Sequence, residues 1–340
     1  MENRIRYIDN TSVFYDIWKN ISTVDLRNGS IGEYFLDDIK KANISINQVK
    51  DFTWIVDVAW EGHNAKDVEH FRQYLINLGV TRFGAVFTSY VDVDRLPYPA
   101  VCLPDKLIYI GRWYNSLTRQ HVDWQNLPMT HKVVSLMRRA STSRCHLAKK
   151  LQDVFAAEDL VLTLGTGPGN YSDQYKHIIK FPIVVDFELV DNHVEMPHFR
   201  HSHLKFYQAP VQVVVESGNE LDETSWQTPF VTEKSYKALS WYQFPLWHAV
   251  PYFVEKIRQQ GFDVFDDIID HSYDTESNPM KRIDQVVAET KKLCRLDPVH
   301  LRQRLWSRLK SNATLVNSIH NTAHSQHQAE ITRLKNEFIW

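Results

Sequence analysis

The sequence predicts an α/β protein built from two halves in tandem, each with a parallel sheet covered by helices. Two observations lead to this fold class. The chain has 340 residues, which is enough for two domains that each bury a core. Short apolar runs also alternate with segments of helical period, and this alternation is typical of strand–helix–strand units.

The first half is predicted from three apolar runs with the length of buried strands, at residues 52–60, 82–88 and 106–110. Between the first two runs, apolar residues recur at helical spacing up to a glycine (Val68, Phe71, Leu75, Leu78 and Gly79). We therefore expect a strand, a helix over 66–78 and a second, parallel strand.

The same alternation returns after residue 128 and predicts the second half. Strands are expected at 132–137, 159–164, 183–186 and 211–215. Helices are expected at 143–156, from Thr232 onward, and at 251–260, which begins with Pro251 and ends before Gly261. With a linker at 115–129, the expected parts are 1–125, 126–285 and a helical segment, 286–340, that packs across both halves.

The composition is that of a folded protein, with 43% hydrophobic, 12% aromatic and 24% charged residues. A net charge of −2 gives no global basic field for nucleic acid. Three distant cysteines argue against a disulfide framework and against a zinc ribbon. Without a signal-peptide core or a long apolar run, the expectation is a soluble, cytoplasmic protein with no membrane span.

Residues 229–239 carry the strongest functional signal. They combine a short apolar strand end, an N-cap at Thr232 and a helix whose first turn contains Glu233 and Lys234. Helix N-termini suit phosphates, Lys234 and Lys237 would add positive charge, and Glu233 could bind the two hydroxyls of a ribose. The plain alternative is an ordinary helix start with an i,i+4 surface pair between Glu233 and Lys237.

Two further features extend this candidate nucleotide site. Basic residues follow the strand at 132–137, with hydroxyl residues as candidate helix caps (Arg138, Arg139, Ser141, Thr142 and Arg144). Arginine suits bidentate phosphate contact, although a solvated basic turn has the same pattern, and only one of Arg138 and Arg139 is expected to contact a ligand. Glu216, at the end of a buried strand, could support a ribose or the Lys234 amine, or simply cap a turn.

These segments resemble the donor-binding motif of inverting glycosyltransferases of the GT-B fold, of the fucosyltransferase-like group and its relatives in large viruses and phages. The resemblance rests on residues 230–239 with the preceding 214–217, on 134–144 and on 261–274. It implies two Rossmann-like domains facing a cleft, with acceptor binding in 1–125 and nucleotide-sugar binding in 126–285. A viral member would work in the host cytoplasm. The chain departs from the group at 240–246, where relatives have a small residue before an apolar strand.

The resemblance also places the catalytic base in the first half, across the cleft from the donor. The best candidates lie where the first clear strand ends, in residues 57–63. Glu61 ranks first and His63 second, because both fall in the loop that follows the strand, where a base can reach an acceptor. Asp57 ranks third, since an aspartate within a strand is more often structural.

The expected function is therefore metal-independent, inverting transfer of a sugar from a nucleotide sugar to an acceptor hydroxyl. The acceptor is either a glycan or a hydroxylated base in DNA. The alternative is a catalytically inactive GT-B-like module that binds glycans or partners. Three weaker signals are set aside: an Asp-x-Asp match at Asp92 and Asp94, a glycine-rich loop at 165–169 and a histidine group at 198–203.

Overall fold

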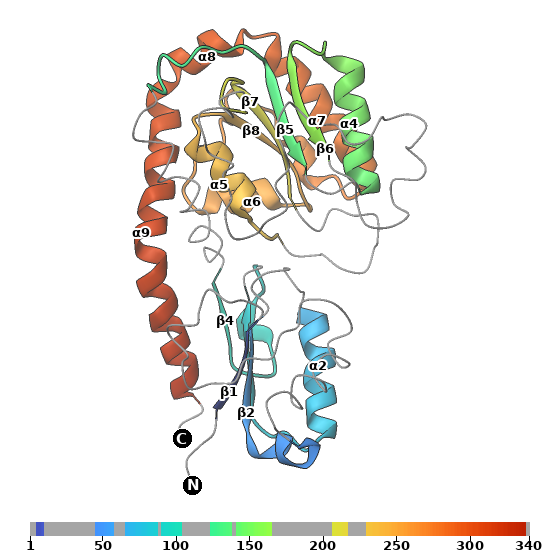
Figure 1. Ribbon diagram of the computed structural model, residues 1–340, viewed down its shortest axis with the longest axis vertical. Coiled ribbons are helices and arrows are strands. Elements are labelled where there is room, and N and C mark those ends of the chain that lie inside the picture. The colour runs from blue at the N-terminus through green and yellow to red at the C-terminus, as the bar shows by residue number, and fades with distance from the viewer. Residues whose placement is uncertain are drawn as a thin grey trace. The chain divides into compact units, whose positions relative to one another are not determined.

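The computed structural model describes residues 5–9, 45–57, 65–87, 90–103, 123–137, 141–164, 206–216 and 229–337 (Figure 1). The chain divides into two compact units. Unit 1 comprises Met1–Lys106, Ser225–Phe230 and Thr322–Trp340, and unit 2 comprises Leu107–Thr224 and Val231–Asn321. Each unit contains a four-stranded sheet, and every strand pair in both sheets is parallel. The predicted α/β class with parallel sheets is confirmed.

Unit 1 has the strand order β1-β2-β3-β4. Its strands are β1 (Ile5–Asp9), β2 (Thr53–Asp57), β3 (Phe83–Phe87) and β4 (Ala100–Cys102). Helix α2 (Ala65–Asn77) connects β2 to β3, as the sequence predicted, and Gly79 follows it with a φ of 85° that favours glycine. Short 3-10 helices occupy Ile46–Asp51 and Val93–Arg95.

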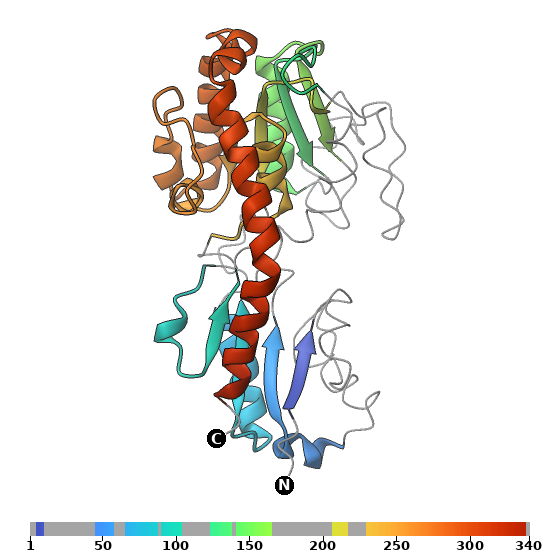
Figure 2. The same ribbon diagram turned by 90° about the vertical axis from the view of Figure 1, so that its left-hand side faces the viewer.

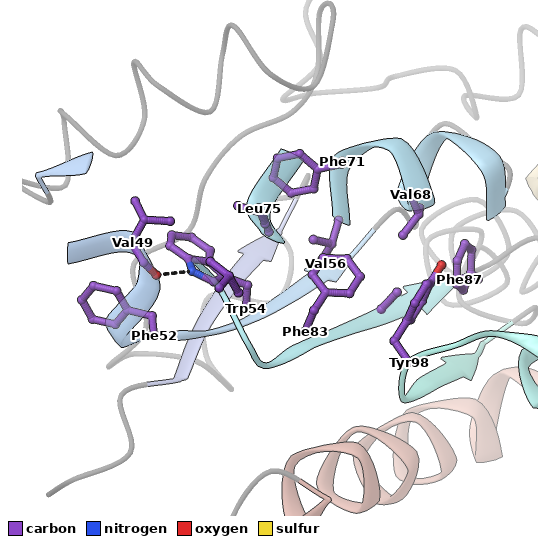
Figure 3. Packing of buried hydrophobic residues seen from close by; sticks show 12 residues of the cluster. Val49, Phe52, Trp54, Val56, Val68, Phe71, Leu75, Phe83, Phe87 and Tyr98 are labelled. Carbon is purple, nitrogen blue, oxygen red and sulfur yellow. Dashed lines mark hydrogen bonds between the residues drawn. The ribbon is translucent and has the colours of Figure 1, made fainter. Parts of the chain in front are cut away.

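The core of unit 1 lies between α2 and the sheet. The helix contributes Val68, Phe71 and Leu75, which are the apolar residues at helical spacing, and the strands contribute buried side chains such as Trp54 (Figure 3). The indole N–H of Trp54 donates to the carbonyl oxygen of Val49 at 2.9 Å, so this large ring is buried without an unpaired donor.

Unit 2 has the strand order β6-β5-β7-β8. The strands are β5 (Val133–Met137), β6 (Leu160–Leu164), β7 (Val211–Val215) and β8 (Phe244–His248). Helix α4 (Thr142–Val154) connects β5 to β6, and α5 (Glu233–Ser240) lies between β7 and β8 in the chain. All four of these strands are almost entirely buried, as expected for a parallel sheet with helices on its faces.

The strand order of this sheet has a switch point between β5 and β7, where successive strands are added on opposite sides. From β5 it moves outward to β6, whereas from β7 it moves outward to β8 on the other side. Because such crossovers are right-handed, α4 and α5 cover opposite faces. Both helices begin at the carboxyl ends of adjacent strands, so a crevice between their N-termini is the preferred ligand position in this type of sheet.

The remaining helices are α6 (Phe253–Gln259), α7 (Pro279–Cys294), α8 (Pro298–Arg304) and α9 (Trp306–Asn336). Helix α7 packs against α4 and against β7 and β8. Helix α9 is one continuous helix whose first part belongs to unit 2 and whose last part belongs to unit 1 (Figure 2). In unit 2, the Asn312 side chain donates to the carbonyl oxygen of Asp263 at 2.8 Å and accepts its N–H at 2.9 Å.

Aromatic residues gather where β5, β7 and β8 begin, at the amino edge of the unit 2 sheet (Trp124, Tyr207, Trp241, Tyr242 and Trp306). The buried guanidinium of Arg302 joins this cluster and lies 4.7 Å from the centre of the Trp306 ring. It donates to the carbonyl oxygens of Trp124, Gln125 and Tyr242. Burial lowers the pKa of Arg302 to about 10, because these neutral acceptors replace water only in part.

The strands and helices predicted inside the described ranges are found there, with ends shifted by a few residues, except the short strand end expected at 229–231, where the chain forms no strand. Three strands were not predicted, namely β1, β4 and β8. The expected strands at 106–110 and 183–186 lie outside the described residues, and the three-part division at 125 and 285 stays a prediction. Among the described residues, no helix is long and apolar enough to span a membrane.

Arg302→Ala is expected to lower the free energy of unfolding by about 3 kcal/mol, because one buried and two partly buried carbonyl groups lose their donor. Chemical denaturation measures this loss. The control is Arg304→Ala on the same helix, where the side chain is exposed and the change should stay below about 0.5 kcal/mol. Equal losses of unfolding free energy in the two variants would contradict the inference that the hydrogen bonds of Arg302 stabilise the amino edge of the sheet.

Candidate functional site

The candidate site is built around Glu216, which directly follows β7 and is 1% exposed. Its backbone N–H donates to the carbonyl oxygen of His248 at 3.1 Å, so the carboxyl ends of β7 and β8 are joined at this residue. Its carboxylate accepts three hydrogen bonds, from the Thr232 N–H at 3.2 Å, from the Thr232 hydroxyl at 2.5 Å and from the Ser235 hydroxyl. The start of α5 is therefore fixed to the end of β7.

Thr232 is the N-cap of α5, as the sequence predicted. Its backbone is extended, and its hydroxyl oxygen accepts the Lys234 N–H at 3.2 Å. The same oxygen accepts a hydrogen bond from Lys234 Nζ at 3.1 Å. Since the hydroxyl proton points to Glu216, one side chain connects the strand end, the helix start and the lysine ammonium group.

The Lys234 ammonium group lies between two carboxylates. Its Nζ is 3.8 Å from Glu216 Oε2 and 3.8 Å from Glu233 Oε1. Glu216 is buried, whereas the side chains of Lys234 and Glu233 keep 28% and 30% of their surface exposed. A solute can therefore reach the two residues of the first helical turn, while the carboxylate that orients them is shielded from water.

Burial and nearby charges shift the pKa values of Glu233 and Lys237 on α5. Burial alone would raise the pKa of Glu233, but the ammonium groups of Lys234 and Lys237 and hydrogen bonds outweigh it, and the pKa is lowered. Burial lowers the pKa of Lys237 to about 8, with Glu233 and Glu216 opposing the shift and Lys234 adding to it. Near neutral pH the Glu233 side chain is therefore ionised, and most of Lys237 is still an ammonium group.

Helix α4 presents a second N-terminus at the same edge of the sheet. Its N-cap is Ser141, whose hydroxyl accepts the Arg144 N–H at 3.5 Å. The pKa of the buried His248 is lowered to about 3, first by burial and then by the charges of Arg282, Arg144 and His146. Arg144 is thus close enough to the end of β8 for its charge to act there, and His248 stays neutral at ordinary pH.

The structure brings together five of the predicted site residues, namely Glu216, Thr232, Glu233, Lys234 and Lys237. Glu216 combines two of its predicted roles, because it caps the start of α5 and lies beside the Lys234 amine. Ser141 and Arg144 lie at the start of α4, across the switch point of the same sheet.

The side chains of the other predicted site residues are not among those that the structure describes. Arg138, Arg139, Glu61 and His63 lie outside the described residues. Asp57 is the last residue of β2 in unit 1, and only its backbone is described.

Sequence reasoning missed two residues that complete this network. Ser235 is fully buried and donates to Glu216, and its oxygen accepts the indole N–H of Trp247 at 3.0 Å. Ser235 stands three residues after the N-cap, which is the position where capping-box side chains act, so its spacing was an available signal. Trp247 was missed because Pro245 made the 244–248 run a poor match to a strand.

The weaker signals gain no support from the described residues. Asp92 forms an ion pair with Arg95 at 2.8 Å beside a 3-10 helix. The glycine-rich loop at 165–169 and the histidines at 198–203 lie outside the described residues. Within the described part of the chain, no group of three or more histidine, cysteine or acidic side chains could hold a metal ion.

Comparisons with models of protein families, with curated proteins and with solved structures gave no match to the chain. The function is therefore inferred from the residues of this site and from the topology that positions them.

Glu216→Gln is expected to lower the free energy of unfolding by about 2 kcal/mol, because a buried amide offers one acceptor oxygen where the carboxylate satisfies three donors. Urea denaturation measures the change. Glu233→Gln is the matched control on the same turn, and its partly exposed side chain predicts a loss below about 0.5 kcal/mol. A loss in the control as large as that of Glu216→Gln would contradict the assignment.

Proposed function

We propose that the chain is a metal-independent, inverting glycosyltransferase that moves a sugar from a nucleotide sugar to an acceptor hydroxyl. In this proposal the two α/β units are the two Rossmann-like halves of a GT-B enzyme. The observation that carries the proposal is the position of the Thr232–Lys237 turn. It starts a helix at the carboxyl edge of a parallel sheet, beside the switch point between β5 and β7.

The start of α5 has the chemistry that a sugar nucleotide requires. A helix N-terminus favours a phosphate through its N–H groups and its partial positive charge. Lys234 adds an ammonium group to the first turn of α5, Lys237 adds one to the next turn, and Arg144 lies near the start of α4. These groups can neutralise the charge that develops on the departing pyrophosphate, which is the role of a metal ion in other enzymes.

Donor binding must change how the charges in this turn are paired. Glu216 and Glu233 already lie beside Lys234, so an incoming phosphate competes with two carboxylates for the same ammonium group. Glu216 is fixed by three hydrogen bonds, whereas Glu233 is partly exposed. We infer that Glu233 turns to the ribose hydroxyls, and that the phosphate takes its place beside Lys234.

The acceptor side of the proposal rests on unit 1. Strand β2 ends at Asp57, and Glu61 and His63 follow it in the sequence, where we expect a loop. A carboxylate or imidazole in that loop would remove the proton of the acceptor hydroxyl as the sugar is transferred. The acceptor is a glycan or a hydroxylated base in DNA, and a salt-sensitive gel shift with duplex DNA distinguishes these two classes.

The competing function is a catalytically inactive module that keeps the scaffold and binds glycans or partners. The bulky residues at 240–246, which follow the donor helix, favour this alternative. Trp241 and Tyr242, however, pack with Trp124 and Tyr207 where β7 and β8 begin. Since α5 starts at the carboxyl edge, this bulk lies at the far end of the helix from Thr232. Donor binding without hydrolysis or transfer would favour the module.

The proposal predicts that one nucleotide or nucleotide sugar raises the melting temperature of the protein, with or without a chelator. At a ligand concentration of about 100 times Kd, the stabilisation is about 2.7 kcal/mol. Lys234→Ala should weaken binding and markedly reduce the shift, with a Kd that calorimetry can still measure, whereas Lys310→Ala, an exposed lysine of α9, should keep the full shift. The proposal fails if no nucleotide among a panel of UDP, GDP and other sugar donors stabilises or is hydrolysed by the wild-type protein.

Nucleotide affinity should fall as the pH rises through 8. Lys237 has a pKa of about 8, so its side chain is an ammonium group below that pH and a neutral amine above it. Losing a charged donor to phosphate predicts about a tenfold increase in Kd between pH 7 and pH 9. Calorimetry at both pH values measures the change. Lys237→Arg stays charged and should show a flat profile, and an equally steep profile in that variant would contradict the role of Lys237.

A further inference from the structure

A continuous series of hydrogen bonds leads from the start of α5 into the core of unit 2. Its first links are Lys234 to Thr232, Thr232 to Glu216, and Ser235 to Glu216. The indole N–H of Trp247 then donates to the Ser235 hydroxyl oxygen at 3.0 Å. Trp247 lies in β8 and is 1% exposed, so the series crosses from the helix to the neighbouring strand without passing through water.

The direction of each hydrogen bond follows from the atoms involved. An indole N–H can only donate, so it must use a lone pair of the Ser235 oxygen. The single hydroxyl proton of Ser235 is then directed to Oε1 of Glu216. The other carboxylate oxygen, Oε2, accepts the hydroxyl proton of Thr232. With its proton committed to Glu216, the Thr232 oxygen is left with only lone pairs, and Lys234 occupies them with its N–H and Nζ.

The main chain of Trp247 is fixed as well. Its N–H donates to the Tyr273 hydroxyl oxygen at 3.3 Å, and that hydroxyl is 2.8 Å from Nδ1 of His271. The other ring nitrogen of His271 is 2.8 Å from the carbonyl oxygen of Val264, which can only accept. Nε2 therefore carries the ring proton, and Tyr273 donates to Nδ1. Trp247 is therefore held by hydrogen bonds at its backbone N–H and at its indole N–H.

We propose that Trp247 is a positioning residue of the α5 N-terminal site, and that it orients the Lys234 ammonium group through Ser235, Glu216 and Thr232. The inference rests on the proposed function, because it takes the ligand of this site to be the phosphate of a nucleotide. Trp247 does not touch the ligand in this account. Its indole N–H selects one of the orientations available to the Ser235 hydroxyl, and a single lysine position follows from that choice.

The series of hydrogen bonds from Trp247 through Ser235, Glu216 and Thr232 to Lys234 is called the relay below. Its chemistry explains why a tryptophan is needed in this strand. A phenylalanine at 247 would fill most of the same space but would leave the Ser235 oxygen without its donor. The Ser235 hydroxyl could then rotate away from Glu216, and that carboxylate would gain freedom to approach Lys234 more closely. A tighter pair between Lys234 and Glu216 would compete with a bound phosphate, so nucleotide affinity should fall.

A double-mutant cycle on nucleotide binding tests the proposal. Calorimetry gives the Kd of the nucleotide selected in the thermal-shift panel for wild type, Trp247→Phe, Lys234→Ala and the double variant. Trp247→Phe should raise Kd about fivefold, which is the size of the effect of one ordinary hydrogen bond. The same substitution should have no further effect in the Lys234→Ala background, because Trp247 acts through that lysine.

Two further variants make the test independent of folding losses. Tyr236→Phe removes a hydrogen bond between α5 and Gln260 that lies outside the relay, so it should leave Kd unchanged. Ser235→Ala interrupts the same relay with a smaller change of volume and should reproduce the increase, which also serves if Trp247→Phe does not fold. An unchanged Kd in Ser235→Ala and in a folded Trp247→Phe overturns this inference alone. Absence of nucleotide binding by wild type overturns the proposed function and this inference with it.

Discussion

The buried carboxylate of Glu216 is the interaction on which the candidate site depends. Removing a carboxylate from water is costly, and here three donors and the Lys234 ammonium group offset that cost. Two of those donors belong to the residue that caps α5, so the position of the helix start is set by the end of β7. A site held in this way varies little in geometry, which is what recognition of a phosphate at a helix N-terminus requires.

The topology of unit 2 explains why this start lies where a ligand can reach it. Strands β5 and β7 are neighbours whose following helices, α4 and α5, lie on opposite faces, so neither of these two helices covers the carboxyl edge between the strands. Ser141 begins one helix at this edge and Thr232 begins the other. The opposite edge is closed by Arg302 and a cluster of aromatic rings, and the bulky residues that end α5 belong to it. The ligand position and the closely packed aromatic cluster thus lie at opposite edges of the same sheet.

Local signals made much of this predictable from the sequence. The N-cap at Thr232 and the helical spacing of Val68, Phe71 and Leu75 depend on residues close in the chain, and the structure agrees with them. The sequence did not determine whether Glu216 supports Lys234, binds a ribose or caps a turn. Its role depends on tertiary contacts between residues 16 positions apart in the chain. Trp247 gave no signal, since its role depends on the pairing of β8 with β7, and Pro245 obscured that strand. The catalytic base cannot be chosen from pattern alone, because several acidic and imidazole groups follow β2.

Hydrogen–deuterium exchange with and without a nucleoside diphosphate tests the central claim most directly, because it locates the ligand on the chain without presupposing the sugar or the acceptor. The account predicts that added protection concentrates in peptides covering 229–240, with a second, smaller change in those covering 141–147. Protection confined to other parts of unit 2, with exchange at the start of α5 unchanged by a nucleotide that demonstrably binds, would contradict the claim that this turn is the nucleotide site.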